Sequence, residues 1–405
     1  MKPLEGIKVV ELATYLAAPS CARTMADWGA DVIKIEPPQG DIYRIMGVAQ
    51  RVPNIGDNNP VYDNENVNKK FIALNLKDPA GTEVLMKLLE DADVFVTNTR
   101  PKALKKLGLS YEDLKDRFPR LIHASVLGYG EKGPDKDRPA FDYTTFYART
   151  GMMADLPQKN QDVMNTIPGL GDHVVGSILL SGICAALYAR TITGKGDCVD
   201  AGLYQAGIYA MSNGMLMANF GREMPRTRYE LNNPISNTYK CKDGEWVYLA
   251  ATAYDKQWPL LCEKVFKRQD LLDNPEYATI AKVTKHAPDV AHILDDIFAT
   301  EDSTYWLDLF AEYDIPHERV AHYKDIAHDE QAWANNYIRE ETYPTGEKVV
   351  FTNTPVNFAS ITEEAPFKLA PVTGGNTREV LAAAGYSNEE IDKLAESGAI
   401  KVVDK

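Results

Sequence analysis

One carboxylate stands where the surrounding residues favour chemistry. Asp172 lies in the glycine-rich run Pro168-Gly169-Leu170-Gly171-Asp172-His173, and the apolar residues 177–187 follow directly. The run is expected to open a helix, whose positively polarised start would lie beside an acid that a substrate can approach from the other side. Asp is also a preferred N-cap residue, and capping Asp residues far outnumber catalytic ones. From these residues alone, both roles stay open.

Other nucleophiles and metal sites have no sequence signature. The seven histidines form neither an HExxH nor an HxH pattern, and no GxSxG run is present. The five cysteines are scattered without a CxxC pair, which is typical of reduced thiols in a cytoplasmic protein. Metal catalysis is therefore not expected, and Asp172 is the leading nucleophile candidate largely by elimination.

Residues 128–133 spell a literal GxGxxG directly after the strand expected at 121–127. A dinucleotide site also needs a helix that opens at this loop. Pro134 and Pro139 follow instead, so a nicotinamide-dependent dehydrogenase is not predicted. The loop is better suited to letting a ligand approach the backbone.

The chain carries a formal charge of −14, which argues against nucleic acid or an anionic membrane as a partner. Its basic residues gather at 69–70, 100–106, 132–138 and 195, and three of these groups lie beside expected strand ends. They are either solvated surface or the binding site of a polyphosphate ligand such as coenzyme A. The longest apolar stretch, 178–189, is expected to be too short to span a membrane. No signal peptide is expected, which predicts a cytoplasmic protein.

Short strand-like and helix-like runs alternate in the first part of the chain. This alternation predicts parallel strands joined by crossovers, and hence an open, Rossmann-like α/β fold. Strands are expected at 7–12, 31–36, 72–75, 94–97, 121–127 and 198–201, and helices at 20–28, 81–89, 111–117 and 173–192.

A second, smaller α+β unit is expected in the middle of the chain. It opens with a hairpin over 237–250, whose Asp243-Gly244 pair favours a tight turn. We expect a large α/β domain over 1–220, a linker over 221–236, the small domain over 237–320, an irregular return linker over 321–355, and the last part of the large domain over 356–405.

Several stretches, taken in order, resemble the class III coenzyme A transferases. This resemblance implies a large α/β domain built from both chain ends, a small domain from the middle, and two open rings interlocked as a homodimer. The stretches that carry it are residues 6–12, 17–21, 28–36 (Trp-Gly-Ala-Asp-Val-Ile-Lys-Ile-Glu), 68–70, 98–101, 107–109, 128–130, 133–134 and 193–196.

Residues 141–144, 329–335 and 343–346 further resemble the branch that moves coenzyme A onto 2-hydroxy acids such as phenyllactate or 2-hydroxyisocaproate. The resemblance implies an acyl-CoA donor, a 2-enoyl-CoA by preference, and a small carboxylic acid acceptor. No tightly bound cofactor is implied, because the coenzyme A thioester is itself the substrate.

The resemblance makes Asp172 the nucleophile. Attack on the thioester would give a mixed anhydride, and the released thiolate would then form an aspartyl-CoA thioester on Asp172. The helix start would keep the carboxylate ionised. Leu16 stands where formyl-CoA transferase has a glutamine, so oxyanion stabilisation would have to come from backbone amides or elsewhere. Residues 249–254 stand where that enzyme has a glycine-rich lid.

The resemblance also implies a set of binding residues. Lys106 and Leu107 match positions that hold the adenine end of coenzyme A, and Tyr129 lies on the loop that precedes the active site. Further expected coenzyme A contacts are Lys69, Asn98 and Arg100, and the expected substrate-side residues are Leu16, Tyr143 and Phe146.

Two alternatives remain on the sequence alone. A racemase of the same fold carries a His-Asp pair in the stretch matching residues 140–143, because it must move a proton to and from the α-carbon. Phe141 stands at the histidine position and takes up no proton. A non-catalytic acyl-CoA-binding protein is the second alternative, and the intact Asp172 argues against it.

Overall fold

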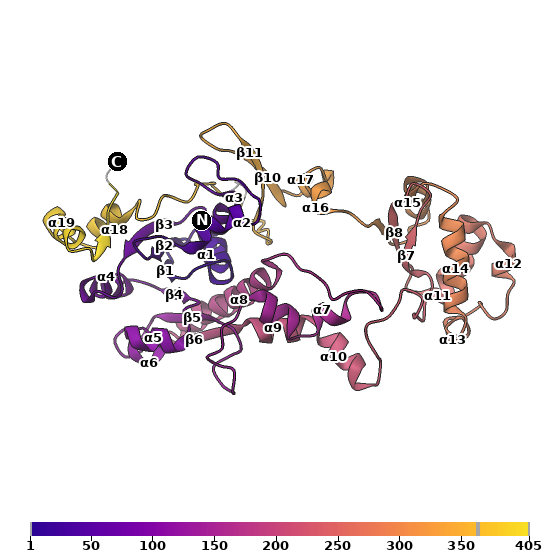
Figure 1. Cartoon of the computed structure of the whole chain (residues 1–405), viewed down its shortest axis with the longest axis horizontal. Helices are drawn as coiled ribbons and strands as arrows, with labels where there is room; N and C mark the ends of the chain where they lie inside the picture. The colour runs from indigo at the N-terminus through magenta and orange to yellow at the C-terminus, as the bar shows by residue number, and fades with distance from the viewer. Residues whose placement is uncertain (1, 362–364, 404–405) are drawn as a thin grey trace. The chain divides into compact units, whose positions relative to one another are not determined.

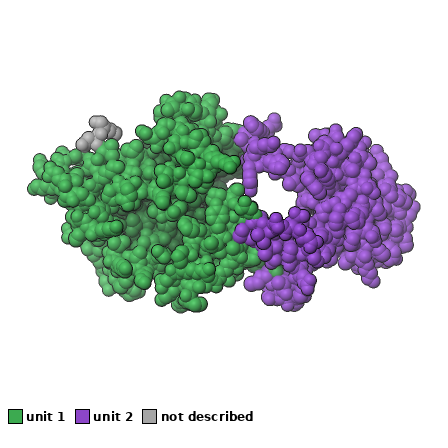
Figure 2. Space-filling model, in the orientation of Figure 1, with its two compact units in different colours: residues 1–152, 165–214, 331–405 green, residues 153–164, 215–330 purple. Residues whose placement is uncertain are grey.

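The computed structural model describes residues 2–361 and 365–403, and the chain forms two compact units (Figures 1 and 2). Unit 1 holds residues 1–152, 165–214 and 331–405, and unit 2 holds residues 153–164 and 215–330. The domain organisation expected from the sequence also placed both chain ends in one unit. The units differ from it in detail, because residues 153–164 group with unit 2 and unit 1 resumes at 331.

Unit 1 is organised around a seven-stranded sheet in the order β12-β3-β2-β1-β4-β5-β6. Six strands run parallel, and β12 pairs antiparallel with β3 at one edge. This confirms the expected α/β class with a mainly parallel sheet. The strands are β1 (Lys8–Leu12), β2 (Asp31–Glu36), β3 (Lys70–Leu74), β4 (Val94–Thr97), β5 (Ile122–Leu127), β6 (Cys198–Gly202) and β12 (Ile400–Lys401).

The order of the strands contains one reversal. The chain moves outward from β1 through β2 to β3, then returns to the other side of β1 with β4, β5 and β6. Val10 of β1 is paired with Ile33 of β2 on one side and with Phe95 of β4 on the other. Loops that leave the carboxyl ends of β1 and β4 therefore diverge, which is where open α/β sheets bind ligands.

Side-chain caps mark the starts of some helices of unit 1. The Asp78 side chain accepts a hydrogen bond from the Ala80 N–H at the start of α4, and Ser387 with Glu390 forms the expected capping box before α19. The helices up to α10 are α1 (Ala17–Asp27), α2 (Met46–Ala49), α3 (Pro60–Asn66), α4 (Pro79–Leu89), α5 (Pro101–Leu107), α6 (Tyr111–Leu114), α7 (Met152–Asp155), α8 (Leu170–Thr193), α9 (Leu203–Ala210) and α10 (Ser212–Asn219). Of these, α7 and α10 belong in large part to unit 2. After unit 2 come α17 (Glu330–Ala334), α18 (Thr377–Ala383) and α19 (Asn388–Glu396).

The segment expected to be an irregular return linker contains a β-hairpin, so that expectation is wrong for its second half. Strand β10 (Ile338–Thr342) pairs antiparallel with β11 (Lys348–Thr352). Tyr343, at the turn between them, is buried, and its hydroxyl donates to Asp63 Oδ2 over 2.8 Å. A contact 280 residues away in sequence holds this hairpin.

Helix α8 is the one described helix that is long and apolar enough to cross a membrane by length and composition. The length argument against a spanning segment is therefore wrong. Core helices of globular proteins pass the same test. Near its end, the buried Arg190 guanidinium pairs with Asp93 Oδ1 over 2.7 Å and donates to the Arg120 carbonyl over 3.0 Å. These contacts tie α8 to the sheet.

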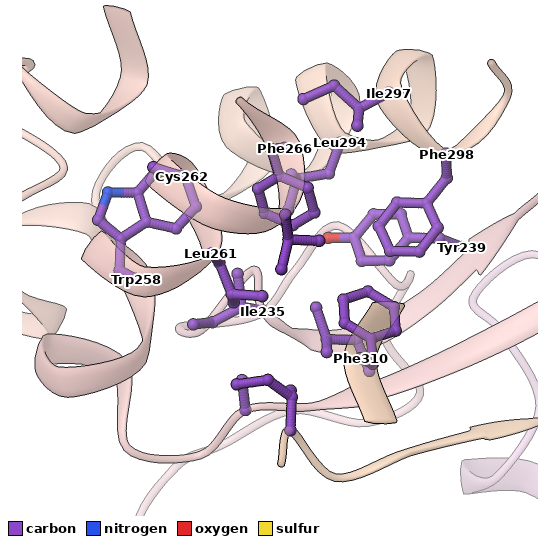
Figure 3. Packing of buried hydrophobic residues seen from close by; sticks show 14 of the residues in the cluster. Ile235, Tyr239, Trp258, Leu261, Cys262, Phe266, Leu294, Ile297, Phe298 and Phe310 are labelled. Atoms are coloured by element: carbon purple, nitrogen blue, oxygen red, sulfur yellow. The ribbon is translucent and has the colours of Figure 1, made fainter. Parts of the chain in front are cut away.

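Unit 2 has its own sheet and core (Figure 3). The predicted hairpin at Asp243-Gly244 is confirmed, with β7 (Ser236–Lys240) and β8 (Trp246–Ala250) antiparallel and β9 (His317–Arg319) added alongside β8. Tyr239 stacks on Phe298 with ring centroids 4.6 Å apart. The helices are α11 (Tyr254–Leu260), α12 (Gln269–Leu272), α13 (Ile280–Val283), α14 (Ala287–Phe298), α15 (Ser303–Glu312) and α16 (Tyr323–Ile326).

Candidate active site

A cavity of about 580 Å³ in unit 1 opens at the carboxyl ends of the central strands. Thr14 follows β1, Asn98 follows β4, Gly128 follows β5 and Leu203 follows β6, and all four line the cavity. The cavity therefore lies at the reversal of the strand order, where the fold is expected to bind a ligand. Its lining includes Tyr15, Leu16, Tyr43, Met46, Gln50, Arg100, Lys136, Arg138, Phe141, Asp142, Tyr143 and Asp172.

Asp172 reaches this cavity from the first turn of α8. Gly169 occupies the N-cap position with φ 104°, a left-handed conformation that favours glycine, and Asp172 is the third helical residue. The N-cap alternative for Asp172 is therefore wrong. Among the described residues, no donor forms a hydrogen bond to its carboxylate. An acid in a ligand-sized cavity that caps nothing is free to react.

The environment of Asp172 is short of positive charge. Burial raises its pKa to about 7, and the negative charges of Asp142 and Glu65 contribute, while His173 opposes them. Burial therefore outweighs the helix start, which does not keep the pKa of Asp172 at its ordinary value. A carboxylate whose charge is poorly solvated is a stronger nucleophile than one in water.

Two acidic residues that the sequence did not mark as site residues support Asp172. Asp142 is buried, and its Oδ2 accepts a hydrogen bond from the Gly169 N–H over 2.8 Å. Glu65 Oε1, on α3, lies 2.9 Å from His173 Nε2. The charge of Glu65 raises the pKa of His173, which favours the protonated imidazole beside Asp172. No sequence motif reveals either contact.

The loop between β1 and α1 forms another wall. Tyr15 has φ 62°, a conformation that costs a non-glycine residue about 1–3 kcal/mol. Asn98 restrains the loop, because its Oδ1 accepts from the Thr14 N–H over 3.1 Å and its Nδ2 donates to the Thr14 carbonyl over 2.6 Å. The Tyr15 ring contacts Phe141 edge-on with centroids 5.3 Å apart. The two rings thus form an aromatic part of the cavity that Asp172 also lines.

Five of the ten residues predicted from the sequence meet at the cavity. They are Leu16, Asn98, Arg100, Tyr143 and Asp172. Sequence reasoning missed Tyr43, Met46 and Gln50, because the short turns at Ile42–Ile45 and Met46–Ala49 give no periodic signal.

The other five predicted residues do not line the cavity. Phe146 is buried, and its ring lies where a Cβ on Gly171 would stand, so it packs behind the start of α8. Lys106 is exposed at the end of α5, next to the half-buried Leu107. Tyr129 lies under the guanidinium groups of Arg138 and Arg149.

Lys69 is the clearest departure from the predicted site. Its ammonium is excluded from solvent, 2.7 Å from Glu11 Oε2, and it donates to the Pro19 carbonyl over 2.9 Å. A ligand phosphate has no access to it. The expected coenzyme A contact is therefore wrong for this residue.

Comparison with known proteins agrees with this geometry. The family model described as CoA-transferase family III matches residues 4–377. The (R)-2-hydroxy-4-methylpentanoate CoA-transferase of Clostridioides difficile is 42% identical over 98% of this chain and 99% of its own length. The cinnamoyl-CoA:phenyllactate CoA-transferase of Clostridium sporogenes is 39% identical, over 98% and 97%.

A solved structure shares the fold. The crystal structure of a CAIB/BAIF family protein from Brucella suis superimposes with a TM-score of 0.81 at 26% identity, covering 95% of this chain and 99% of that one. The resemblance first seen in the ordered motifs is thus confirmed at the level of the whole chain. The chain belongs to CoA-transferase family III and is a class III CoA-transferase.

Proposed function

We propose that this transferase moves coenzyme A from a 2-enoyl-CoA to a branched or aromatic 2-hydroxy acid, with Asp172 as the temporary carrier. The observation that carries the proposal is the Asp172 carboxylate, which lines a ligand-sized cavity without a hydrogen-bond partner among the described residues. The names of the two clostridial relatives support the choice of substrates.

The proposed reaction exchanges one carboxylate for another at every step. An Asp172 oxygen attacks the thioester carbonyl, the C–S bond breaks, and coenzyme A leaves as a thiolate from a mixed anhydride. The thiolate attacks the Asp172 carbonyl, and the donor acid departs as a carboxylate. The acceptor carboxylate then attacks the aspartyl-CoA thioester, which expels the thiolate and gives a second mixed anhydride. The thiolate attacks the acceptor's carbonyl carbon, the anhydride C–O bond breaks, and Asp172 leaves as a free carboxylate. Because no water is consumed, the thioester energy is kept.

Residues around Asp172 would hold it for these attacks. Asp142 anchors the Gly169 N–H and so fixes the first turn of α8. Leu16 brings no side-chain donor to the cavity, so the oxyanion would be stabilised by backbone amides or by groups outside this wall. The aromatic side chains of Tyr15 and Phe141 cover apolar surface beside the carboxylate and would help to exclude water.

Among the described residues, three basic side chains line the cavity: Arg100, Lys136 and Arg138. We assign them to the phosphates of coenzyme A, because Arg and Lys pair with phosphate oxygens. Lys106, Leu107 and Tyr129 lie outside the cavity and stay proposals for the adenine end.

The wall near Asp172 favours an acceptor with one carboxylate and an apolar side chain. It carries Tyr15, Tyr43, Met46, Phe141 and Tyr143, and the nearby acidic groups are Asp142 and Glu65. The His173 imidazole beside them is already paired with Glu65. A second carboxylate on the substrate would meet negative charge and lose its solvation.

Trapping the carrier tests the proposal directly. Wild-type protein is incubated with cinnamoyl-CoA or 4-methyl-2-pentenoyl-CoA and then treated with hydroxylamine or borohydride, and its peptides are mapped by mass spectrometry. A modification on Asp172 that disappears when phenyllactate or 2-hydroxy-4-methylpentanoate is added supports the proposal. Modification elsewhere, or a clear preference for oxalate or carnitine as acceptor, would overturn it.

We further propose that the chain works as a homodimer in the cytoplasm. Large apolar side chains on α8 and α9 are exposed in the single chain, with Tyr188, Ile192 and Tyr209 at 70%, 73% and 76% exposure. Such a surface is typical of a subunit interface. Sedimentation equilibrium tests this, and a monomer at micromolar concentration would contradict it.

A further inference from the structure

A cluster of four buried charges lies beneath the loop that joins β1 to α1. Lys34 Nζ is 2.7 Å from Glu11 Oε1 and 3.3 Å from Asp41 Oδ2, and Lys69 Nζ is 2.7 Å from Glu11 Oε2. All four side chains are excluded from solvent. Two ammonium groups and two carboxylates leave the cluster formally neutral.

Both ammonium groups also hold backbone that shapes the active-site cavity. Lys34 donates to the Ala13 carbonyl over 2.9 Å, and Lys69 donates to the Pro19 carbonyl over 2.9 Å. These carbonyls flank residues 14–17, which line the cavity. The two lysines therefore fasten both ends of one cavity wall.

The cluster also reaches a second wall. Asp41 Oδ1 accepts a hydrogen bond from the Tyr43 N–H over 2.9 Å, and Tyr43 lines the cavity. The phenol of Tyr43 is close enough to Asp172 for the negative charge of Asp172 to raise its pKa, after the larger effects of burial and Glu65. The charges of Lys34 and Asp41 thus connect the β1–α1 loop to a side chain beside Asp172.

Stability alone is a weak reason for such a cluster. Replacing buried ion pairs by well-packed neutral groups is often neutral or stabilising, because the desolvation of the charges offsets their attraction. The loop above it, in contrast, contains Tyr15 at φ 62°, a conformation that persists only where the surroundings restrain it. The lysines supply restraints at both of its ends.

We propose that Lys34 and Lys69, joined through Glu11, are positioning residues that fix residues 13–19 and Tyr43 around the Asp172 carboxylate. The inference rests on the proposed function in one respect, because the rate of coenzyme A transfer is the quantity that tests it. It gives Lys69 a role in catalysis without contact with coenzyme A.

Charge-balanced double variants separate positioning from stability. Glu11→Gln/Lys69→Met leaves the Lys34–Asp41 pair, and Lys34→Met/Asp41→Asn leaves the Lys69–Glu11 pair, so neither variant buries a net charge. The corresponding single variants Lys69→Met and Lys34→Met each leave one unbalanced carboxylate and are expected to lose stability. Lys70→Met is the matched control, because Lys70 pairs with Asp31 at the surface.

We expect both doubles to keep a melting temperature within about 5 °C of wild type and to lose kcat by roughly 10- to 100-fold, since small misplacements of reacting groups are costly. KM for the acyl-CoA should stay within about threefold, because Arg100, Lys136 and Arg138 remain. Lys70→Met should match wild type in both constants. Trapping should show slower formation of the modified Asp172 peptide in the doubles.

Wild-type kcat in both doubles would overturn the inference. Failure of both doubles to fold, judged by circular dichroism, would assign the cluster to stability and would also overturn it. If instead the wild-type protein transferred no coenzyme A at all, the proposed function would fail, and trapping with acyl-CoA would show this before any variant is made.

Discussion

The Asp142 carboxylate accepts a hydrogen bond from the Gly169 N–H over 2.8 Å, which joins a buried acid to the residue at the N-cap of α8. Its other oxygen accepts from the Tyr143 N–H over 2.7 Å. Asp142 therefore fixes the turn that presents Asp172, and its negative charge also raises the pKa of Asp172, second only to burial. One residue both places the proposed nucleophile and limits its ionisation.

Asp142→Asn should separate these two effects. The amide oxygen can still accept from Gly169, but the negative charge is gone, so the pKa of Asp172 should fall. Because the proposed reaction needs the ionised carboxylate, kcat/KM of wild type should rise with pH through a midpoint near 7. In the variant that midpoint should move down by about 0.5–1 pH unit. Rate profiles from pH 5 to 9 measure it, with the surface variant Asp91→Asn as control, and an unchanged midpoint would contradict the electrostatic role.

Asp172→Asn should abolish transfer and stabilise the protein above neutral pH. An ordinary Asp titrates near 3.9 when unfolded, whereas burial raises the pKa of Asp172 to about 7 in the fold. Between these values the folded state binds more protons, so its stability falls as pH rises and stays lower above pH 7. The neutral amide escapes this loss. Urea unfolding at pH 8 should show the variant more stable by about 1–3 kcal/mol, and at pH 4.5 the gain should largely vanish. A gain that is equal at both pH values would contradict the assigned pKa.

The strands of the parallel sheet were predictable because each is a short apolar run between helices. The predicted strands at 31–36 and 94–97 coincide with β2 and β4. The position of Asp172 at the start of a helix was also predictable from its glycines. Both predictions depend on patterns among residues that are close together in the sequence.

The burial of Lys69 was not predictable in the same way. Its position beside Lys70 is typical of a solvated pair, and only the spatial order of β1, β2 and β3 brings it against Glu11. The contacts of Glu65 with His173 and of Asp142 with Gly169 are likewise set by packing between distant segments. The sequence shows which residue types are present, but their contacts depend on the tertiary structure.

Substitutions of Gln50 test whether charge in the cavity determines which acceptor acid is preferred. Gln50 lines the cavity, and the charges that raise the pKa of Asp172 are those of Asp142 and Glu65, opposed only by His173 among the described residues. Gln50→Arg should supply a cation for a second carboxylate and raise the glutarate-to-hydroxyacid ratio of kcat/KM about tenfold or more. Gln50→Glu is the matched opposite and should lower that ratio. Competition assays with both acceptors measure it, and ratios that move the same way in both variants would rule out an electrostatic cause.

Lys136 and Arg138 should act on the phosphates of coenzyme A and not on the reacting thioester. Both line the cavity, on the loop that follows β5. Lys136→Gln and Arg138→Gln should therefore raise KM for the acyl-CoA by about 3- to 30-fold each, with little change in kcat, since each removes one charge-assisted contact. Neither substitution should change KM or kcat with an acyl-pantetheine substrate, because this substrate lacks the nucleotide phosphates. Lys132→Gln, on the same loop but outside the cavity lining, is the control and should leave both substrates unaffected. Equal losses with acyl-CoA and acyl-pantetheine would mean that the two cations act nearer to Asp172 than the phosphate assignment allows.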